Sequence, residues 1–122
     1  MKRITIGDTP YRLICAERDG QWLAHAEHDA TGDSFGIECS GTSEADAVAR
    51  LTRWLEWQAE HSAALDALQR AERAYHRTIA GSAFASPMEG PSAIELQKES
   101  LEAVEAARVR LDEIRARRPE AT

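Results

Sequence analysis

The strongest constraint on this chain is one uninterrupted helical segment in its middle. It runs from Ser43 to about Ile79 without a proline or a glycine. Nothing in it therefore removes a helix hydrogen bond or adds backbone freedom. At ~1.5 Å per residue the helix would be roughly 55 Å long, which is longer than a small domain is wide. We therefore expect its two halves to pack against different elements.

The apolar residues of this helix fall into two stripes. Val48, Leu51 and Leu55 lie within about 60° of one another in helical projection. A second stripe is rotated by roughly 120° from the first; it consists of Leu65, Leu68, Tyr75 and Ile79. We predict that the first half covers a β-sheet and that the second half pairs with another helix. Trp54 and Trp57 are predicted to point toward the second stripe, away from the sheet.

The residues before the helix alternate between apolar and polar side chains, as strands do. The alternating segments are residues 2–6, 11–18, 21–27 and 34–40, and Asp19-Gly20 is a typical two-residue hairpin turn. Their predicted inward side chains are Tyr11, Leu13, Cys15, Trp22, Ala24, Ala26, Phe35, Ile37 and Cys39. The pattern predicts an antiparallel meander of three strands, or four if residues 2–6 join it, with one apolar face that needs a cover.

The residues after the long helix predict a helix that returns along it. A connection rich in glycine, serine and proline spans residues 80–91, and a second helix is expected over 92–118. Ser92 and Glu95 have the spacing of a capping box. The apolar stripe of this second helix contains Ile94, Leu101, Val104, Ala107, Leu111 and Ile114.

The predicted fold is α+β, with the meander covered by a long helix that continues into an antiparallel helical hairpin of coiled-coil type. Residues 1–60 hold the sheet and the first half of the helix, and residues 61–122 hold the hairpin. We expect the two parts to unfold as one cooperative unit.

The net charge, the N-terminal sequence and the lack of a long apolar segment argue against a nucleic-acid-binding, secreted or membrane-spanning protein. The formal net charge is −6 at pH 7, so no overall basic field favours nucleic acid. The N-terminus lacks the apolar core of a signal peptide, and no segment has the length and hydrophobicity of a membrane span. We expect a soluble cytoplasmic protein.

The residues with chemical potential form no recognisable catalytic motif. Cys15 and Cys39 are expected to be buried free thiols, with a disulfide left open if their strands are neighbours. His25, His28 and Asp29 are ligand types for a metal, but on a strand the two histidines point to opposite faces, and no CxxC or HExxH pattern accompanies them. We predict no enzyme activity and no cofactor; whether these three residues bind a metal, as a small metal-dependent enzyme would require, stays open.

Two surfaces are candidates for binding a partner. The first contains Trp54, Trp57, Arg53 and Arg115, with Arg115 or Arg118 expected to lie over an indole ring. The second is the outer face of the sheet, with Arg12, Ile14, Leu23 and His25. An alternative use of the tryptophans, together with Arg50 and Arg53, is base stacking and phosphate contact with nucleic acid.

Residues 11–58 resemble the N-terminal domain of HicB-like antitoxins. The matching residues are Tyr11, Asp19-Gly20, Trp22, Gly41-Thr42 and, one place displaced, Glu44-Ala45. The resemblance implies a partial ribonuclease-H-like sheet with a helix on one face, used to bind a protein. The loop before the last strand lacks the proline usual in that family, and a helical hairpin stands where many members carry a DNA-binding module.

The sequence as a whole favours a non-catalytic, regulatory protein-binding module, possessing antitoxin-like features and binding either a protein partner or a second copy of itself. A homodimer is expected, and nucleic-acid association is the alternative.

Overall fold

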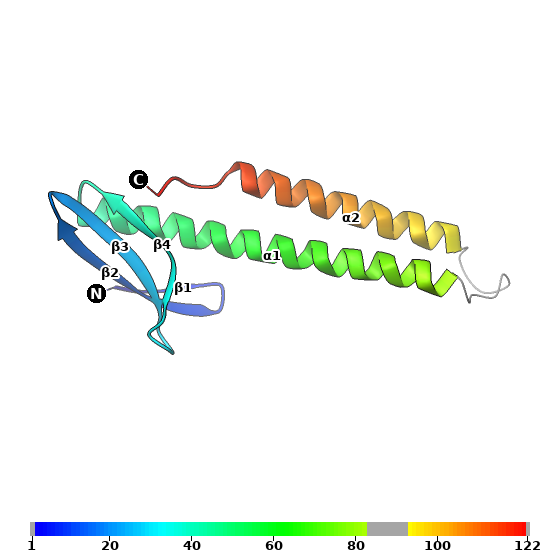
Figure 1. The fold of residues 1–122 in the computed structure, drawn as a ribbon, viewed down its shortest axis with the longest axis horizontal. Helices are drawn as coiled ribbons and strands as arrows, with labels where there is room; N and C mark the ends of the chain where they lie inside the picture. The colour runs from blue at the N-terminus through cyan, green and yellow to red at the C-terminus, as the bar shows by residue number, and fades with distance from the viewer. Residues whose placement is uncertain (1, 83–92, 122) are drawn as a thin grey trace. The chain divides into compact units, whose positions relative to one another are not determined.

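A computed structural model describes residues 2–82 and 93–121. The elements are β1 (Lys2–Ile6), β2 (Thr9–Arg18), β3 (Gln21–His28), β4 (Ser34–Gly41), α1 (Glu44–Ser82) and α2 (Ala93–Ala116). The strands form one antiparallel sheet in the order β1-β2-β3-β4 (Figure 1). The predicted α+β fold is confirmed in its four-stranded form, with α2 packed on α1. Ser92 of the expected capping box lies outside the described residues.

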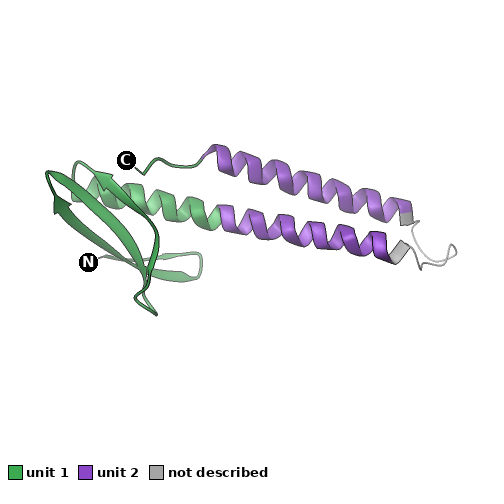
Figure 2. Ribbon diagram, in the orientation of Figure 1, with its two compact units in different colours: residues 1–60, 118–122 green, residues 61–117 purple. Residues whose placement is uncertain are grey.

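The chain divides into two compact units (Figure 2). The first contains residues 1–60 together with 118–122, and the second contains residues 61–117. The C-terminal residues 118–122, which the sequence grouped with the hairpin, thus belong with the sheet. The backbone N–H of Ser40 in β4 donates to the carbonyl of Ala121 at 2.9 Å.

The turn between β2 and β3 has the backbone that its sequence predicts. Asp19 and Gly20 have φ angles of 52° and 82°, and two successive positive φ angles are what a type I′ turn requires. The turn fixes the register, in which Arg18 pairs with Gln21 and Tyr11 pairs with His28. Because side chains alternate along a strand, this register decides which residues face the helix.

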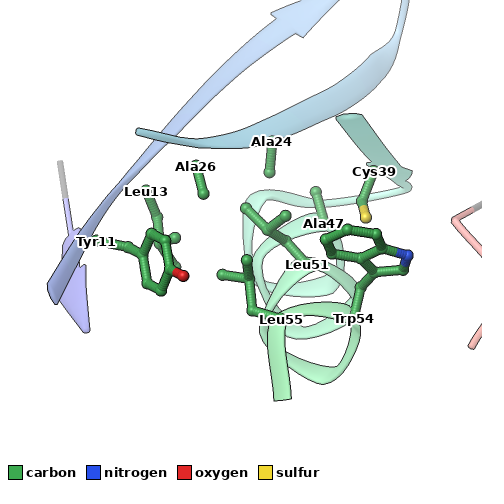
Figure 3. Packing of buried hydrophobic residues seen from close by; sticks show 9 residues of the cluster. All are labelled: Tyr11, Leu13, Ala24, Ala26, Cys39, Ala47, Leu51, Trp54 and Leu55. Carbon is green, nitrogen blue, oxygen red and sulfur yellow. The ribbon is translucent and has the colours of Figure 1, made fainter. Parts of the chain in front are cut away.

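One face of the sheet packs against the first half of α1. The buried cluster consists of Tyr11, Leu13, Ala24, Ala26, Cys39, Ala47, Leu51, Trp54 and Leu55 (Figure 3). Leu51 is fully buried, Leu55 is 2% exposed, and Val48 packs against the cluster. The first predicted stripe of the helix therefore faces the sheet.

The predicted direction of Trp54 was wrong. Its side chain is 6% exposed and belongs to the cluster beneath the sheet. The reason lies in β4, where Gly36 has a φ of 82°, and a Cβ built on it would be 2.5 Å from Cζ3 of Trp54. A residue without a side chain leaves a depression in the strand, and the indole fills it.

Local side-chain contacts set the start of α1. Ser43 caps the helix, since its Oγ accepts from the backbone N–H of Asp46 at 3.1 Å. The Asp46 carboxylate in turn accepts from the N–H of Thr42 at 3.0 Å. That hydrogen bond, with Arg50 close by, lowers the pKa of Asp46. A Cβ on Gly41 would be 2.5 Å from the N of Ala47, so the chain needs glycine here.

The second unit is an antiparallel pair formed by the later part of α1 and by α2. Val104, Leu111 and Ile114 of the predicted stripe are 2%, 3% and 1% exposed. In contrast, Ile94 is 78% and Leu101 39% exposed, so the stripe is not buried along its whole length.

Both helix ends differ from the predicted bounds. Helix α1 continues past Ile79 to Ser82, and α2 ends at Ala116 instead of residue 118. Arg118 precedes Pro119, and a residue before proline is disfavoured in helical conformation.

The two cysteines are free thiols. Both pair with Ala24 of β3, Cys15 from β2 and Cys39 from β4. Two strand spacings separate them, about 9.5 Å, whereas a disulfide needs Cα atoms within roughly 7 Å. The disulfide left open by the sequence does not form.

Candidate functional site

The outer face of the sheet, opposite α1, presents the second of the two predicted surfaces. Ile14 pairs with His25, and Ala16 pairs with Leu23 across β2 and β3. Their inward neighbours belong to the core, so strand alternation directs these four side chains outward. Ile14, Leu23 and His25 are half-buried there, and Ala16 is exposed.

This face is hollowed. A depression of about 380 Å³ is lined by Ile14, Ala16, Glu17, Arg18, Leu23, His25 and Glu38. The apolar members lie on two adjacent strands, while charges of both signs surround them. The hollow thus combines an apolar floor with a charged rim.

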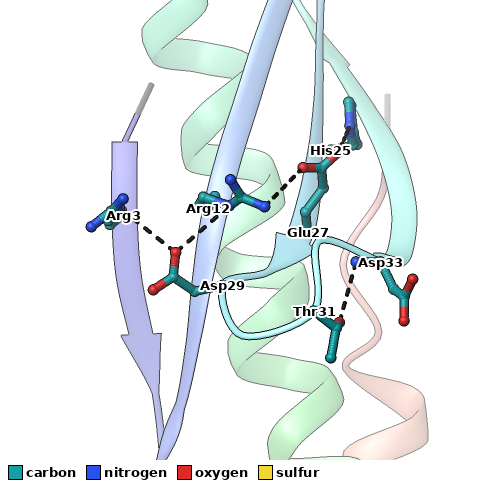
Figure 4. A network of polar contacts seen from close by, with 7 residues as sticks. All are labelled: Arg3, Arg12, His25, Glu27, Asp29, Thr31 and Asp33. Atoms are coloured by element: carbon teal, nitrogen blue, oxygen red, sulfur yellow. Dashed lines mark hydrogen bonds and ion pairs between the residues drawn. The ribbon is translucent and has the colours of Figure 1, made fainter.

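A network of charges continues from the hollow across the sheet (Figure 4). Arg12 Nη2 lies 3.6 Å from Glu27 Oε1, and Arg12 Nε lies 3.6 Å from Asp29 Oδ1. Arg3 Nε lies 3.7 Å from the same Asp29 oxygen, and His25 Nε2 lies 3.5 Å from Glu27 Oε2. Glu27 and Asp29 thus contact Arg12 directly, and His25 and Arg3 join the network through these two carboxylates.

The network is electrostatic more than hydrogen-bonded. Its separations exceed the 2.7–3.2 Å of an N–H···O bond. The buried Nε of Arg12 has no hydrogen-bond partner within the described part of the chain. The side chains of Arg12 and Glu27 are 27% and 22% exposed, so this ion pair is partly desolvated. It places one positive and one negative charge beside the hollow.

The two histidines lie on opposite faces, as the sequence predicts. His28 pairs with the inward Tyr11, and its ring centroid is 5.2 Å from that of Tyr11 and 4.9 Å from that of Phe35. His25 lies on the outer face beside Glu27. Residues 2–82 and 93–121 contain no group of three side chains that could hold a metal ion.

Neither thiol is an activated nucleophile. Burial raises the pKa of Cys15, and the nearby Glu44 carboxylate raises it further. Burial likewise raises the pKa of Cys39, although Arg50 partly opposes the effect. Since the thiolate is the reactive form, the raised pKa makes both thiols less reactive at neutral pH than an exposed cysteine.

The residues of the first predicted surface have separate environments. Trp57 is half-buried, and the guanidinium of Arg118 lies 5.7 Å from its ring centroid. Of the two arginines expected over an indole, Arg118 is therefore the one found there. Arg115, in the second unit, donates from Nε to His61 Nε2 at 3.3 Å.

The remaining arginines near the tryptophans differ in their surroundings. Arg53 is exposed on α1. Arg50 Nε lies 3.5 Å from Asp46 Oδ1, so its charge is largely engaged by its own helix. The pair proposed for phosphate contact thus offers one exposed cation within the first unit.

The strand alternation that assigns Leu23 and His25 to the outer face assigns Glu27 to it as well, and the register sets Glu27 directly across from Arg12. Sequence reasoning missed Asp29 and Glu38 as members of this face. Asp29 lies in the loop after β3, where side chains do not alternate between two faces as they do along a strand.

A comparison of the chain with protein-family models finds no match, and comparisons with curated proteins and with solved structures find none either. Among the helices that the structure describes, none is long and apolar enough to cross a membrane.

Proposed function

We propose that this protein is a non-catalytic binding module whose outer sheet face takes a protein partner. The observation that carries the proposal is the hollow floored by Ile14, Ala16 and Leu23 and rimmed by charges of both signs. Half-buried aliphatic side chains on a solvent-facing sheet lose further contact with water when a partner covers them. The charges around Arg12 then select the partner's orientation.

A second copy of the chain is the simplest partner. The face carries Arg12 and Arg18 as well as Glu27 and Glu38, so two copies related by a two-fold axis can oppose unlike charges. A toxin protein, in the manner of HicB-like antitoxins, is the narrower form of the same proposal. We also propose a cytoplasmic location, because the two cysteines are separated free thiols and free thiols persist in a reducing compartment.

Site-specific photo-crosslinking tests this surface. A photoreactive amino acid replaces Leu23 in the full chain, and a matched protein carries it at Ala49, an exposed position on α1. We expect position 23 to give a discrete crosslinked product, identified by mass spectrometry as a second copy or another protein, and position 49 to give none.

Light scattering supplies the independent measurement. If the partner is a second copy, Leu23→Glu is expected to lower the mass of the particle to that of one chain, while Ala49→Glu leaves it unchanged. A strictly monomeric chain at high concentration, together with equal crosslinking from both positions in cells, would refute the proposal.

A further inference from the structure

Residues 118–121, called the tail below, contact β4, the buried cluster and α1 through three kinds of interaction. The carbonyl of Ala121 accepts the hydrogen bond from Ser40, and the Ala121 side chain packs against the buried cluster. Arg118 lies over the ring of Trp57. In Figure 2 this segment shares the colour of the sheet, to whose unit it belongs.

The segment is not helical, and Pro119 removes a backbone donor while holding the chain extended. A main-chain bond to an edge strand, with alternate side chains received by neighbouring surfaces, is the chemistry by which sheets accept an added peptide.

The buried cluster under the sheet contains a hydrogen-bond donor that residues 118–121 leave unused. Trp54 is 6% exposed, and its indole Nε1 has no hydrogen-bond partner within the described residues. The six-membered ring of the indole contacts Gly36, so the nitrogen lies at the other end of the side chain, away from the other labelled residues (Figure 3). The ring centroids of Trp54 and Trp57 are 6.3 Å apart.

We propose that the β4 edge and Trp57 form a docking site for an extended peptide, and that residues 118–121 occupy this site within the same chain. The tail defines the chemistry of the ligand: an arginine for the face of Trp57, followed three residues later by a small apolar residue whose carbonyl accepts from Ser40. A peptide of this kind displaces the tail. The site uses the backbone edge of β4 and the ring of Trp57, whereas Leu23, which pairs with Ser40, presents its side chain on the outer face.

Peptide binding to full-length variants tests the site. The probe is a fluorescent peptide, Arg-Arg-Pro-Glu-Ala, with the sequence of residues 117–121. Ala121→Asp places a charge against the apolar cluster and is expected to release the tail. We expect this variant to bind the peptide at least tenfold more tightly than the unaltered chain, in which the tail competes. Ala49→Asp, a charge at an exposed position of the same unit, should bind like the unaltered chain.

Hydrogen exchange at the Ser40 amide gives a second readout that does not need the peptide. The amide is expected to be protected in the unaltered chain and to exchange at least tenfold faster in Ala121→Asp, with the far-ultraviolet circular dichroism unchanged. An unprotected Ser40 amide in the unaltered chain would overturn the proposal, because the tail would then not be docked.

The specificity of the peptide separates this site from the outer face. A probe in which alanine is replaced by aspartate should not bind, and Ile14→Glu, on the outer face of β2 and not adjacent to β4, should leave binding of the original probe unchanged. If the released variant does not bind the original probe, or binds both probes equally, the edge is not a docking site, whatever the outcome of crosslinking from position 23.

Discussion

The contact between Gly36 and Trp54 gives a quantitative prediction for the variant Gly36→Ala. The φ angle of Gly36 is 82°, and the added Cβ would lie 2.5 Å from Cζ3 and 3.1 Å from Cη2 of the indole. Both atoms belong to a rigid ring whose side chain is 6% exposed. The ring therefore cannot swing into solvent, and either the strand or the helix must move.

The expected cost has two parts. A Cβ in the left-handed region costs roughly 1–2 kcal/mol, and overpacking a well-filled core costs typically 1–3 kcal/mol. We therefore expect Gly36→Ala to lower the free energy of unfolding by about 2–5 kcal/mol. A small domain has only about 5–15 kcal/mol in total, so the variant is expected to be severely destabilised.

Gly20 supplies a matched control. Its φ angle is also 82°, but a Cβ built on it meets nothing within 4 Å. Gly20→Ala therefore carries the same backbone strain and the same change in unfolded-chain entropy without the clash, and should cost only about 1–2 kcal/mol. The difference between the two variants isolates the contact with Trp54.

Urea denaturation followed by far-ultraviolet circular dichroism measures both variants, with a check that the slope m stays constant. In a double-mutant cycle, Trp54→Leu should relieve about 1–3 kcal/mol of the cost of Gly36→Ala. Equal destabilisation by Gly36→Ala and Gly20→Ala would refute the packing of Trp54 under β4, and the tryptophan would then belong to an exposed surface.

Three further predictions concern the second helix, the start of the first helix and the thiols. Ile114, 1% exposed, should cost about 2–5 kcal/mol on truncation to alanine, whereas the 78% exposed Ile94 should cost under about 0.5 kcal/mol; thermal denaturation distinguishes them, and equal losses would contradict the assigned burial. Because the pKa of Asp46 is lowered in the folded chain, the stabilisation it gives is present above its unfolded pKa and is lost as the pH falls through the lower folded value. Asp46→Asn should therefore be less stable than the unaltered chain at pH 7, and the difference should shrink as the pH falls below the unfolded pKa of the carboxyl; a pH-independent difference would exclude this linkage. Cys39 is fully buried and Cys15 is half-buried, so maleimide should label Cys15 at least tenfold faster; a faster reaction at Cys39 would show that β4 opens readily.

Several parts of this fold could be predicted because their causes are local. The Asp19-Gly20 turn needs only two residues that tolerate positive φ, and the cap at Ser43 needs only a side-chain oxygen three residues before a free N–H. The alternation of β2 and β3 then assigns Ile14 and His25 to the outer face. Each of these features is decided within a few residues of the chain.

The direction of Trp54 could not be predicted in this way. In helical projection it lies about 60° from Leu51, at the margin of the apolar stripe. The sequence of the helix does not show whether a side chain at this margin is buried under the sheet. Gly36, eighteen positions earlier in the sequence, allows Trp54 to be buried, because the absence of a side chain there leaves space for the indole.

The charged network and the docked tail also depend on residues that are distant in the sequence. Asp29 reaches both Arg3 and Arg12 only because the meander brings β1 and the loop after β3 together. Ala121 reaches Ser40 across some eighty intervening residues, and nothing in the sequence of the tail predicts that contact.

The long helix shows most clearly which features depend on the sequence alone and which depend on the tertiary structure. By itself the sequence determined that the segment after Ser43 is helical, that its early stripe covers a sheet and that a second helix returns along its later part, because periodicity, breakers and caps act over one or two turns. Only the tertiary structure decided that Trp54 is part of the core and that Arg118, not Arg115, is the arginine over Trp57, because each of these contacts depends on a partner supplied by another element.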